Sequence, residues 1–370
     1  MDKSKWEYKK LGDICEKGSS NIAQNKIEDN TGDYALYGAS GYVKSIDFYH
    51  QEQPYIGVVK DGSGVGRVNK YPAKSSLLGT MQYIYPKNGC DLGYLLYVLQ
   101  GLHLEKYKTG AAIPHIYFKD YCKCEVPFPS LFDQQRIVAE LDCLNEMIAV
   151  KQEQLKEFDK LAQSIFYDMF GDPVTNEKGW DKVFMKQIIK VVGGYAFKSD
   201  LFKDNGIPIL RIGNINTGEF RPINMVYWIE DDKLSRYVMH PGDLVLSLTG
   251  TVGKDDYGNV CILDNSYDRY YLNQRNAKLE IIGNVEKLYL SRLLKIDEVK
   301  AKLTGTSRGV RQANISNKDI ENLIIPLPPL SLQQQFADKI SAIEAQKELV
   351  KQSIAETQTL LDYTMDYYFN

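Results

Sequence analysis

The chain has 370 residues, of which 44% are hydrophobic and 25% charged, as is usual for a globular protein of two or three domains. It has no run of about 18 apolar residues and no apolar signal peptide, which excludes membrane-spanning and secreted classes and predicts a soluble, cytoplasmic protein. The net charge of −3 is unevenly distributed: residues 1–130 and 171–330 each carry +2, whereas residues 131–170 carry −4 and residues 331–370 carry −3. This charge neither excludes nor demonstrates nucleic-acid binding, because local patches decide phosphate contacts.

The chain contains an internal repeat. VPFPSLFDQQRIVAEL begins at Val126 and IPLPPLSLQQQFADKI begins at Ile325, 199 residues later. Each half also opens on a tryptophan, Trp6 and Trp180, but this offset is only 174, so the second middle region is longer. The two halves thus share their terminal segments and differ in their central segments, which predicts a repeated scaffold that carries two unlike regions. The matched positions are Pro127/Pro326, Pro129/Pro328, Leu131/Leu330, Gln134/Gln333, Gln135/Gln334 and Leu141/Ile340.

Both middle regions are predicted to be mainly β. PYIGVVKDGSGVGRVNKYPA from Pro54 and PGDLVLSLTGTVGKDDYGNVCIL from Pro241 each place an aliphatic strand before a glycine turn and a second strand. The segment from Asp61 to Arg67, DGSGVGR, is similar to a glycine-rich nucleotide loop, but such loops lead into a helix that receives the phosphate. Here VNKYPA follows, including Pro72, so we interpret the segment as a hairpin turn.

Each Pro-rich segment is followed by a long stretch that lacks Pro and Gly and repeats apolar residues at spacings of four and three, as in a coiled coil. Because each stretch leaves an equivalent half in an equivalent way, we expect the two helices to pair antiparallel about a pseudo-two-fold axis. About 37 residues at about 1.5 Å each would give a spacer of about 55 Å between the β regions, which suits two DNA half-sites about one helical turn apart. The predicted first seam is Ile137, Leu141, Leu144, Ile148, Lys151, Leu155, Phe158, Ala162, Ile165 and Met169. The predicted second seam is Phe336, Ile340, Ile343, Lys347, Val350, Ile354, Thr357, Leu361, Thr364 and Tyr368.

No catalytic motif is recognisable. The chain lacks a GxxxxGK[ST] phosphate loop and the Asn/Asp-Pro-Pro-aromatic segment expected of an amino-methyltransferase. The acidic pairs Asp231-Asp232 and Asp255-Asp256 are interpreted as solvated loops rather than a nuclease site. The cysteines and histidines lack metal-ligand spacing, and we expect reduced thiols, no metal and no cofactor in this chain. These residues are Cys15, Cys90, Cys122, Cys124, Cys143, Cys261, His50, His103, His115 and His240.

Over essentially its whole length the chain resembles the specificity subunits of type I restriction–modification systems, which are found in bacteria and archaea. The resemblance rests on the two Pro-rich segments with their paired glutamines, on the trailing helices, and on short patterns in the middles. These patterns are Tyr37–Gly41 (YGASG), Arg211 with Asn214-Ile215 and Gly218, and Pro241–Val245 (PGDLV) with Thr249–Thr251 (TGT). In the second half Ser331-Leu332 stands where family members often carry an acidic residue before the glutamines.

The resemblance implies an α+β fold with two β-rich target recognition domains, separated by two long antiparallel helices that form a coiled coil. The expected segments are recognition domain 1 (1–130), the central helix (131–171), recognition domain 2 (172–330) and the C-terminal helix (331–370). Each recognition domain would read one half of a split site in double-stranded DNA, and the helices would dock two methyltransferase subunits. These partners would bind S-adenosylmethionine and methylate adenine, and restriction/translocase subunits would complete the complex.

Candidate DNA contacts are chosen by chemistry, because Arg and Lys pair with guanine or phosphate and Asn and Gln pair with adenine. In domain 1 they are Lys60, Ser63, Arg67 and Lys70 around the glycine turn, with Lys108 near Gly110. In domain 2 they are Arg211, Asn214, Lys254, Arg275, Asn276, Arg308 and Arg311.

Two other classes of function are open to this sequence. The first is a single-chain nucleic-acid-modifying enzyme with an unrecognised site, which would be active when purified alone. The second is a coiled-coil scaffold whose β domains bind protein or glycan, which would show no salt-dependent DNA binding. The duplicated scaffold with unlike middles favours a non-catalytic, DNA-reading subunit over both.

Overall fold

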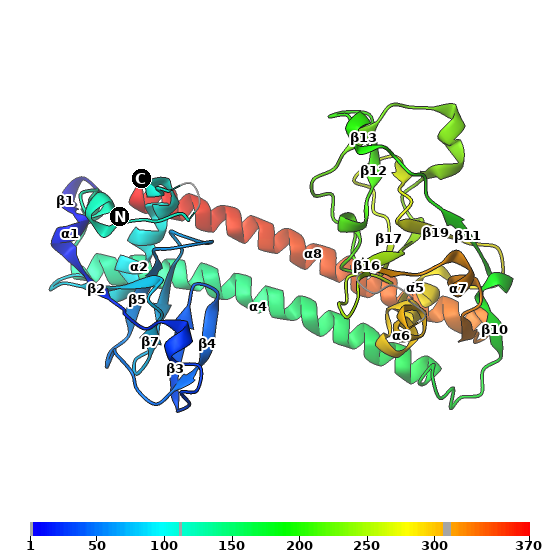
Figure 1. Cartoon of the computed structure of the whole chain (residues 1–370), viewed down its shortest axis with the longest axis horizontal. Helices are drawn as coiled ribbons and strands as arrows, with labels where there is room; N and C mark the ends of the chain where they lie inside the picture. Colours follow the sequence, from blue (N-terminus) through cyan, green and yellow to red (C-terminus); the bar gives the residue numbers. More distant parts are fainter. Residues whose placement is uncertain (1–2, 111–112, 306–311) are drawn as a thin grey trace. The chain divides into compact units, whose positions relative to one another are not determined.

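The computed structural model describes residues 3–110, 113–305 and 312–370. The chain divides into two compact units, unit 1 (Met1–Glu153 with Val350–Asn370) and unit 2 (Gln154–Leu349). Each unit holds one β-rich domain together with parts of two long helices, α4 (Leu131–Phe170) and α8 (Leu330–Phe369) (Figure 1). The division therefore falls inside the helices rather than at their ends.

The β-rich domain of unit 1 contains two sheets. The larger has the strand order β2-β8-β5-β6, with every neighbour antiparallel. All residues of β5 are buried, because the sheet is covered on both faces at this strand. In the smaller sheet, of order β4-β3-β7, β3 pairs antiparallel with β4 and parallel with β7. The strands are β2 (Cys15–Ser19), β3 (Tyr34–Gly38), β4 (Gly41–Ile46), β5 (Tyr55–Val59), β6 (Val68–Tyr71), β7 (Ser76–Leu77) and β8 (Met81–Pro86).

Unit 2 repeats this topology. Its first sheet has the order β11-β19-β15-β17, all antiparallel, and in its second sheet β12 pairs antiparallel with β13 and parallel with β18, with β14 added at the edge. The middles that differ in sequence are thus variants of one β fold. The strands are β11 (Ile189–Gly193), β12 (Ile207–Leu210), β13 (Tyr227–Trp228), β14 (Val238–Met239), β15 (Leu244–Ser247), β17 (Val260–Ile262), β18 (Tyr270–Leu272) and β19 (Asn276–Ile281).

Short elements connect each sheet to the long helices. A two-stranded ladder, β1 (Glu7–Lys10) with β9 (Glu125–Phe128) in unit 1 and β10 (Lys182–Phe184) with β21 (Ile324–Pro326) in unit 2, joins the two ends of each half. The main helices of the β-rich domains are α2 (Leu92–Gly101) and α5 (Lys287–Lys295). The remaining elements are α1 (Leu11–Ile14), α3 (Phe118–Tyr121), α6 (Asp297–Thr304), α7 (Asn317–Glu321) and the ladder of β16 (Thr249–Thr251) with β20 (Gln312–Asn314).

The first glutamine of each repeated pair joins a long helix to the preceding domain. Gln134 is fully buried; its side chain accepts a hydrogen bond from the backbone N–H of Asp91 (2.8 Å) and donates to the carbonyls of Gly89 and Pro129 (3.0 Å each). Asp91 in turn caps α2 by accepting from the backbone N–H of Tyr94. The second glutamine, Gln135, is exposed.

The same junction is built in unit 2. Gln333 is fully buried, accepts from the backbone N–H of Glu286 (2.8 Å) and donates to the carbonyl of Pro328 (2.7 Å), and Glu286 caps α5. The adjacent Gln334 is exposed. The repeat in the sequence is therefore a repeated hydrogen-bonded joint between a β-rich domain and its long helix.

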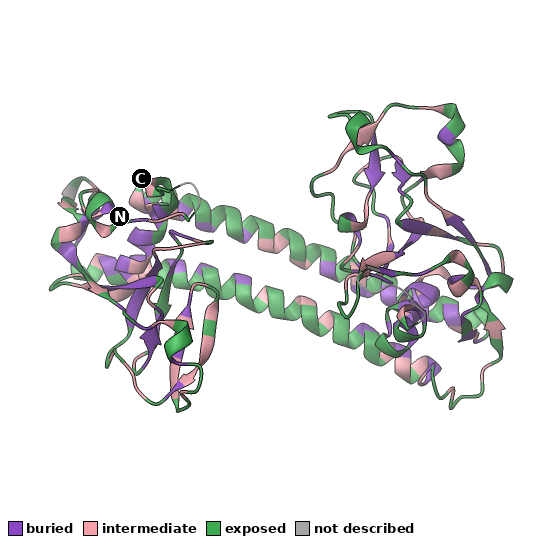
Figure 2. Ribbon diagram, in the orientation of Figure 1, coloured by how far each residue is buried: buried purple, intermediate pink, exposed green. Residues whose placement is uncertain are grey.

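Within each unit the two long helices lie antiparallel. In unit 1, Glu140 of α4 accepts from Tyr368 of α8 (2.6 Å), and about three turns further along α4 the Lys151 ammonium donates to Thr357 of α8 (2.8 Å). In unit 2, Lys347 of α8 forms an ion pair with Asp159 of α4 (2.7 Å). All twenty predicted seam positions are buried or half-buried, which confirms the predicted helix faces. Figure 2 shows buried residues concentrated in the sheets and at intervals along the helices.

Each unit has its own hydrophobic core. In unit 2, Phe166 stacks on Tyr289 of α5 (ring centroids 5.7 Å apart) and meets Phe336 edge-on at 5.6 Å. In unit 1, Ile137 and Leu141 of α4 pack into the cluster that includes α2.

None of the helices in the described ranges is long and apolar enough to cross a lipid bilayer. All six cysteines fall within those ranges, and none of them is in a disulfide there.

Candidate nucleic-acid interface

The glycine turn of domain 1 is a hairpin turn. Residues 61–67 connect β5 to the antiparallel strand β6, so the hairpin prediction is confirmed and no helix follows that could receive a nucleotide phosphate. Gly64 has φ +90°, and a Cβ at this position would lie 2.0 Å from Nη2 of Arg67. Arg67 folds back over this turn and donates to the carbonyls of Gly64 and Ser63 (both 3.3 Å). Arg67 is therefore exposed at the surface of the turn, with its guanidinium held by the turn's own carbonyls.

Contacts around His115 bring the other candidates of domain 1 to the same turn. The His115 ring lies 2.6 Å from the Asp61 carboxylate, and the backbone N–H of Gly62 donates to Pro114. Thr109 exchanges backbone hydrogen bonds with His115, which places Lys108 beside the turn. Lys60 is half-buried within 3.9 Å of Asp61, and Lys70 is exposed on the edge strand β6.

In domain 2, Arg211 and Arg275 line one hollow of about 650 Å³ together with Arg221, which the sequence analysis did not select. Arg211 follows β12, and Arg275 lies in the turn between β18 and β19. Arg221 and Arg275 are exposed, whereas Arg211 is half-buried. The polar lining also includes Asn224, Asn273 and Gln274, and the spacing of the chain gave no signal that these segments would meet.

Two candidates from the sequence, Asn214 and Asn276, are buried and bonded to backbone groups. Asn214 is 2% exposed, accepts from the backbone N–H of Arg211 (2.9 Å) and donates to the carbonyls of Arg221 and Ile223 (3.0 Å each). Asn276 is fully buried and donates to the carbonyl of Leu210 (2.8 Å). Asn214 holds the loop after β12 in place, and Asn276, the first residue of β19, bonds to the last residue of β12.

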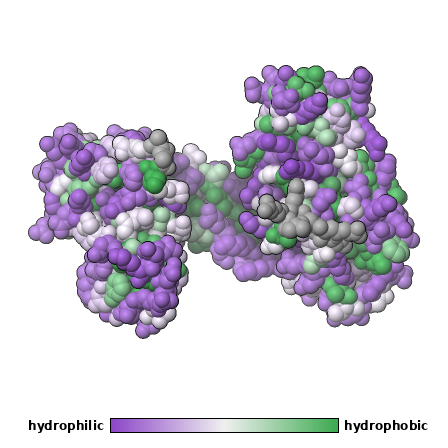
Figure 3. All heavy atoms as spheres, viewed as in Figure 1, coloured by the Kyte–Doolittle hydropathy of each residue, from purple (hydrophilic) through white to green (hydrophobic). Residues whose placement is uncertain are grey.

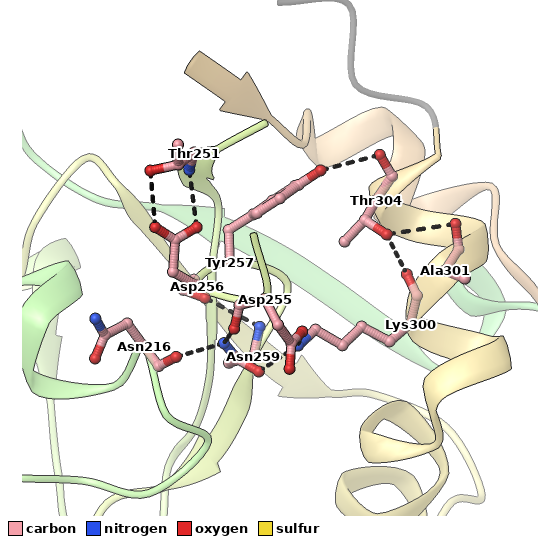
Figure 4. A network of polar contacts seen from close by, with 10 residues as sticks. Asn216, Thr251, Asp255, Asp256, Tyr257, Asn259, Lys300, Ala301 and Thr304 are labelled. Atoms are coloured by element: carbon pink, nitrogen blue, oxygen red, sulfur yellow. Dashed lines mark hydrogen bonds and ion pairs between the residues drawn. The ribbon is translucent and has the colours of Figure 1, made fainter. Parts of the chain in front are cut away.

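Lys254 lies on an exposed loop after strand β16, and Figure 4 shows how this loop is held. Lys300 of α6 is buried and reaches the Asp255 carboxylate and the side-chain oxygen of Asn259 (2.6 Å). Asp256 accepts from the backbone N–H and the hydroxyl of Thr251 (2.8 and 2.9 Å). Asp255 is exposed, as expected for a solvated loop, and the acidic pair also supports the loop through these contacts.

Arg308 and Arg311 lie outside the described residues. Among the described residues, no group of three or more Asp, Glu, His or Cys side chains is arranged to hold a metal ion.

The resolved pKa shifts belong mainly to buried groups of the cores: burial raises the pKa of Cys261 to about 12 and raises the pKa of Tyr289. Neither group reaches the hollow or the glycine turn, so these shifts mark packing rather than acid–base chemistry.

The face of each β-rich domain that is visible in Figure 3 is mostly hydrophilic, with hydrophobic residues in small separate groups. Interfaces with nucleic acid are more polar and more positively charged than interfaces between proteins. This surface, the basic glycine turn and the arginine hollow favour a nucleic-acid ligand over a protein or glycan.

Comparison with known proteins agrees with this interpretation. The family model described as "Type I restriction modification DNA specificity domain" matches residues 3–158 and again residues 177–358. The type I restriction enzyme MjaVIII specificity subunit of Methanocaldococcus jannaschii is 24% identical over 92% of this chain and 86% of its own length.

Two solved structures share the fold. The type I restriction–modification S subunit from M. genitalium covers 99% of this chain and 96% of its own, with 14% identity and a TM-score of 0.60. A chain from a structural study of complex assembly and conformational transition of the type I system covers 98% and 96%, with 17% identity and a TM-score of 0.55. Because the family model matches both halves, the chain belongs to the type I restriction–modification DNA specificity family, as a non-catalytic subunit that recognises DNA.

Proposed function

We propose that this chain reads a split sequence in double-stranded DNA, one half with each β-rich domain, and that its long helices dock two methyltransferase subunits. The partners would bind S-adenosylmethionine and methylate adenine in each half-site, and restriction/translocase subunits would join the complex. No cofactor is assigned to this chain itself.

One observation carries the proposal: two β domains of the same topology are joined to their long helices by the same glutamine junction, yet they present different polar surfaces. Domain 1 offers a glycine turn with lysine and arginine, and domain 2 offers the arginine hollow. A palindromic site would need two identical readers, whereas two unlike readers suit a site with two unlike halves.

The antiparallel helices support the spacing role. Lys151 and Lys347 make polar contacts across the seam, and buried polar groups at a helix seam favour one register over others. A fixed register would keep the separation of the two readers constant, and this constant separation would set the number of unread base pairs between the half-sites.

The test is to express the chain with its methyltransferase subunit in cells that lack other adenine methylation, and to map methylated bases by sequencing. The expected result is one motif with two defined halves and a spacer of constant length. A chimeric chain, in which residues 177–325 are exchanged for the matching region of a relative, should change one half and leave the other unchanged. An undivided motif, or a change of both halves in the exchange, would contradict the proposal.

A further inference from the structure

Arg211, Arg221 and Arg275, from three separate segments, all line the arginine hollow of domain 2. Arg221 and Arg275 also border neighbouring hollows that include Asp255 and Asp256, respectively. The lining of the arginine hollow itself includes no aspartate, glutamate or lysine. Within the described parts of the chain, none of the three arginines forms an ion pair, whereas Arg269 and Arg292 of the same unit pair with glutamates. Three like charges without an ion-pair partner repel one another, so this hollow favours a ligand that is negatively charged or presents hydrogen-bond acceptors.

Buried side chains hold the backbone of these arginines. Asn214 bonds to the backbone N–H of Arg211 and to the carbonyl of Arg221, and so draws two ends of one loop together. The backbone N–H of Arg275 donates to the side chain of Asn273 (3.2 Å), which is 8% exposed. A recognition site needs donors that are held in place before the ligand arrives, and this scaffold provides that order.

The three arginines differ in how free they are. Nη2 of Arg211 donates to the carbonyl of Asn224 (2.5 Å), and its Nε is buried without a partner among the described residues. Arg221 and Arg275 are exposed, and no side-chain hydrogen bond satisfies their guanidinium groups in the described structure. Arg211 therefore forms part of the wall, and Arg221 and Arg275 are free to contact a ligand.

The chemistry points to guanine. A guanidinium is a planar fork that donates two parallel hydrogen bonds to O6 and N7 of guanine in the major groove, whereas the lysine ammonium can also contact guanine but is a compact charge on a flexible stem without this fixed geometry. Resting on the function proposed above, we propose that Arg221 and Arg275 read guanine in the half-site of domain 2, with Asn214 and Asn273 as positioning residues. Sequence preference in this half-site would then depend on a hollow built by segments that are well separated in the chain.

The experiment uses the complete complex with its methyltransferase subunits and the wild-type motif mapped as above, with the half read by domain 2 identified by the exchange of residues 177–325. Arg221→Lys and Arg275→Lys keep the charge but remove the planar fork. We expect each to reduce discrimination at one guanine of that half by about ten- to hundredfold, and to leave the other half unchanged. Arg269→Lys is the matched control, because Arg269 is a half-buried arginine of the same domain that pairs with Glu230 outside the hollow.

A second measurement changes the DNA base instead of the protein, so it tests the same contact without relying on the folding of a variant. Replacing the same guanine with 7-deazaguanine removes the N7 acceptor; it should weaken binding of the wild-type complex and weaken binding of the lysine variant less, because the variant has already lost the two-bond contact. A half-site without guanine, or a uniform loss of affinity with discrimination retained, would overturn the guanine assignment in favour of phosphate contact. A wild-type complex with no split motif would instead overturn the proposed function.

Discussion

The glutamine junction gives a sharp test of how the repeat acts, because each pair has one buried and one exposed member. Gln134→Ala would remove three hydrogen bonds and leave the backbone N–H of Asp91 and two carbonyls without their partner. An unsatisfied buried donor costs about 1–3 kcal/mol and the carbonyls add a smaller amount, so we expect a loss of about 2–4 kcal/mol in the free energy of unfolding of unit 1. Gln135→Ala changes an exposed side chain and should alter this free energy by less than about 0.5 kcal/mol.

Urea unfolding followed by tryptophan fluorescence can measure this difference. Trp6 is in unit 1, where it stacks on Tyr368 with ring centroids 6.1 Å apart, and the other two tryptophans, Trp180 and Trp228, are in unit 2. In a background with Trp180→Phe and Trp228→Phe, the Trp6 signal should shift to a lower urea midpoint for Gln134→Ala and stay in place for Gln135→Ala. Equal midpoints for the two variants would refute the argument that the buried glutamine joins helix and domain.

Three further predictions follow from the packing. Phe166→Ala removes a ring that is 2% exposed and stacked on Tyr289, so it should lower the free energy of unfolding of unit 2 by about 3–5 kcal/mol in urea titration; a loss below about 1 kcal/mol would contradict this core. Lys300→Met keeps the apolar stem but removes the cation that holds the loop at 251–259, so amide hydrogen exchange should rise in this loop and remain unchanged at the glycine turn of domain 1. In alkylation at about pH 8 with mass-spectrometric detection, the exposed Cys143 should react before Cys261, because burial raises the pKa of Cys261 to about 12 and a raised pKa keeps the unreactive thiol form at this pH; equal rates would show that this core opens readily.

The long helices could be predicted residue by residue, because a seam depends only on periodicity. Apolar positions at spacings of four and three fall on one side of a helix whatever the rest of the chain does, and all the expected seam positions are buried or half-buried. The glycine turn was also predictable, because the few residues that follow it show whether a helix or a strand begins there.

The polar positions were less predictable. Asn214 and Asn276 have the side chains of adenine readers, yet both are buried; Asn214 bonds to the backbone of Arg211 and Arg221, and Asn276 bonds to the carbonyl of Leu210. Gln134 and Gln333 were visible as a repeat, but only the structure distinguishes the buried glutamine from its exposed neighbour. The sequence shows that a side chain is an amide and can donate and accept hydrogen bonds, but only its burial in the structure shows whether it bonds to backbone or is available to a ligand.

By itself, the sequence established the duplication, the two helical stripes and the family, because each of these is a pattern along one dimension. The common topology of the two β domains and the meeting of Arg211, Arg221 and Arg275 in one hollow were decided only by the tertiary structure. The physical reason is that strand pairing and loop convergence depend on contacts between residues far apart in the chain, where many different side chains can fill the same place in a sheet.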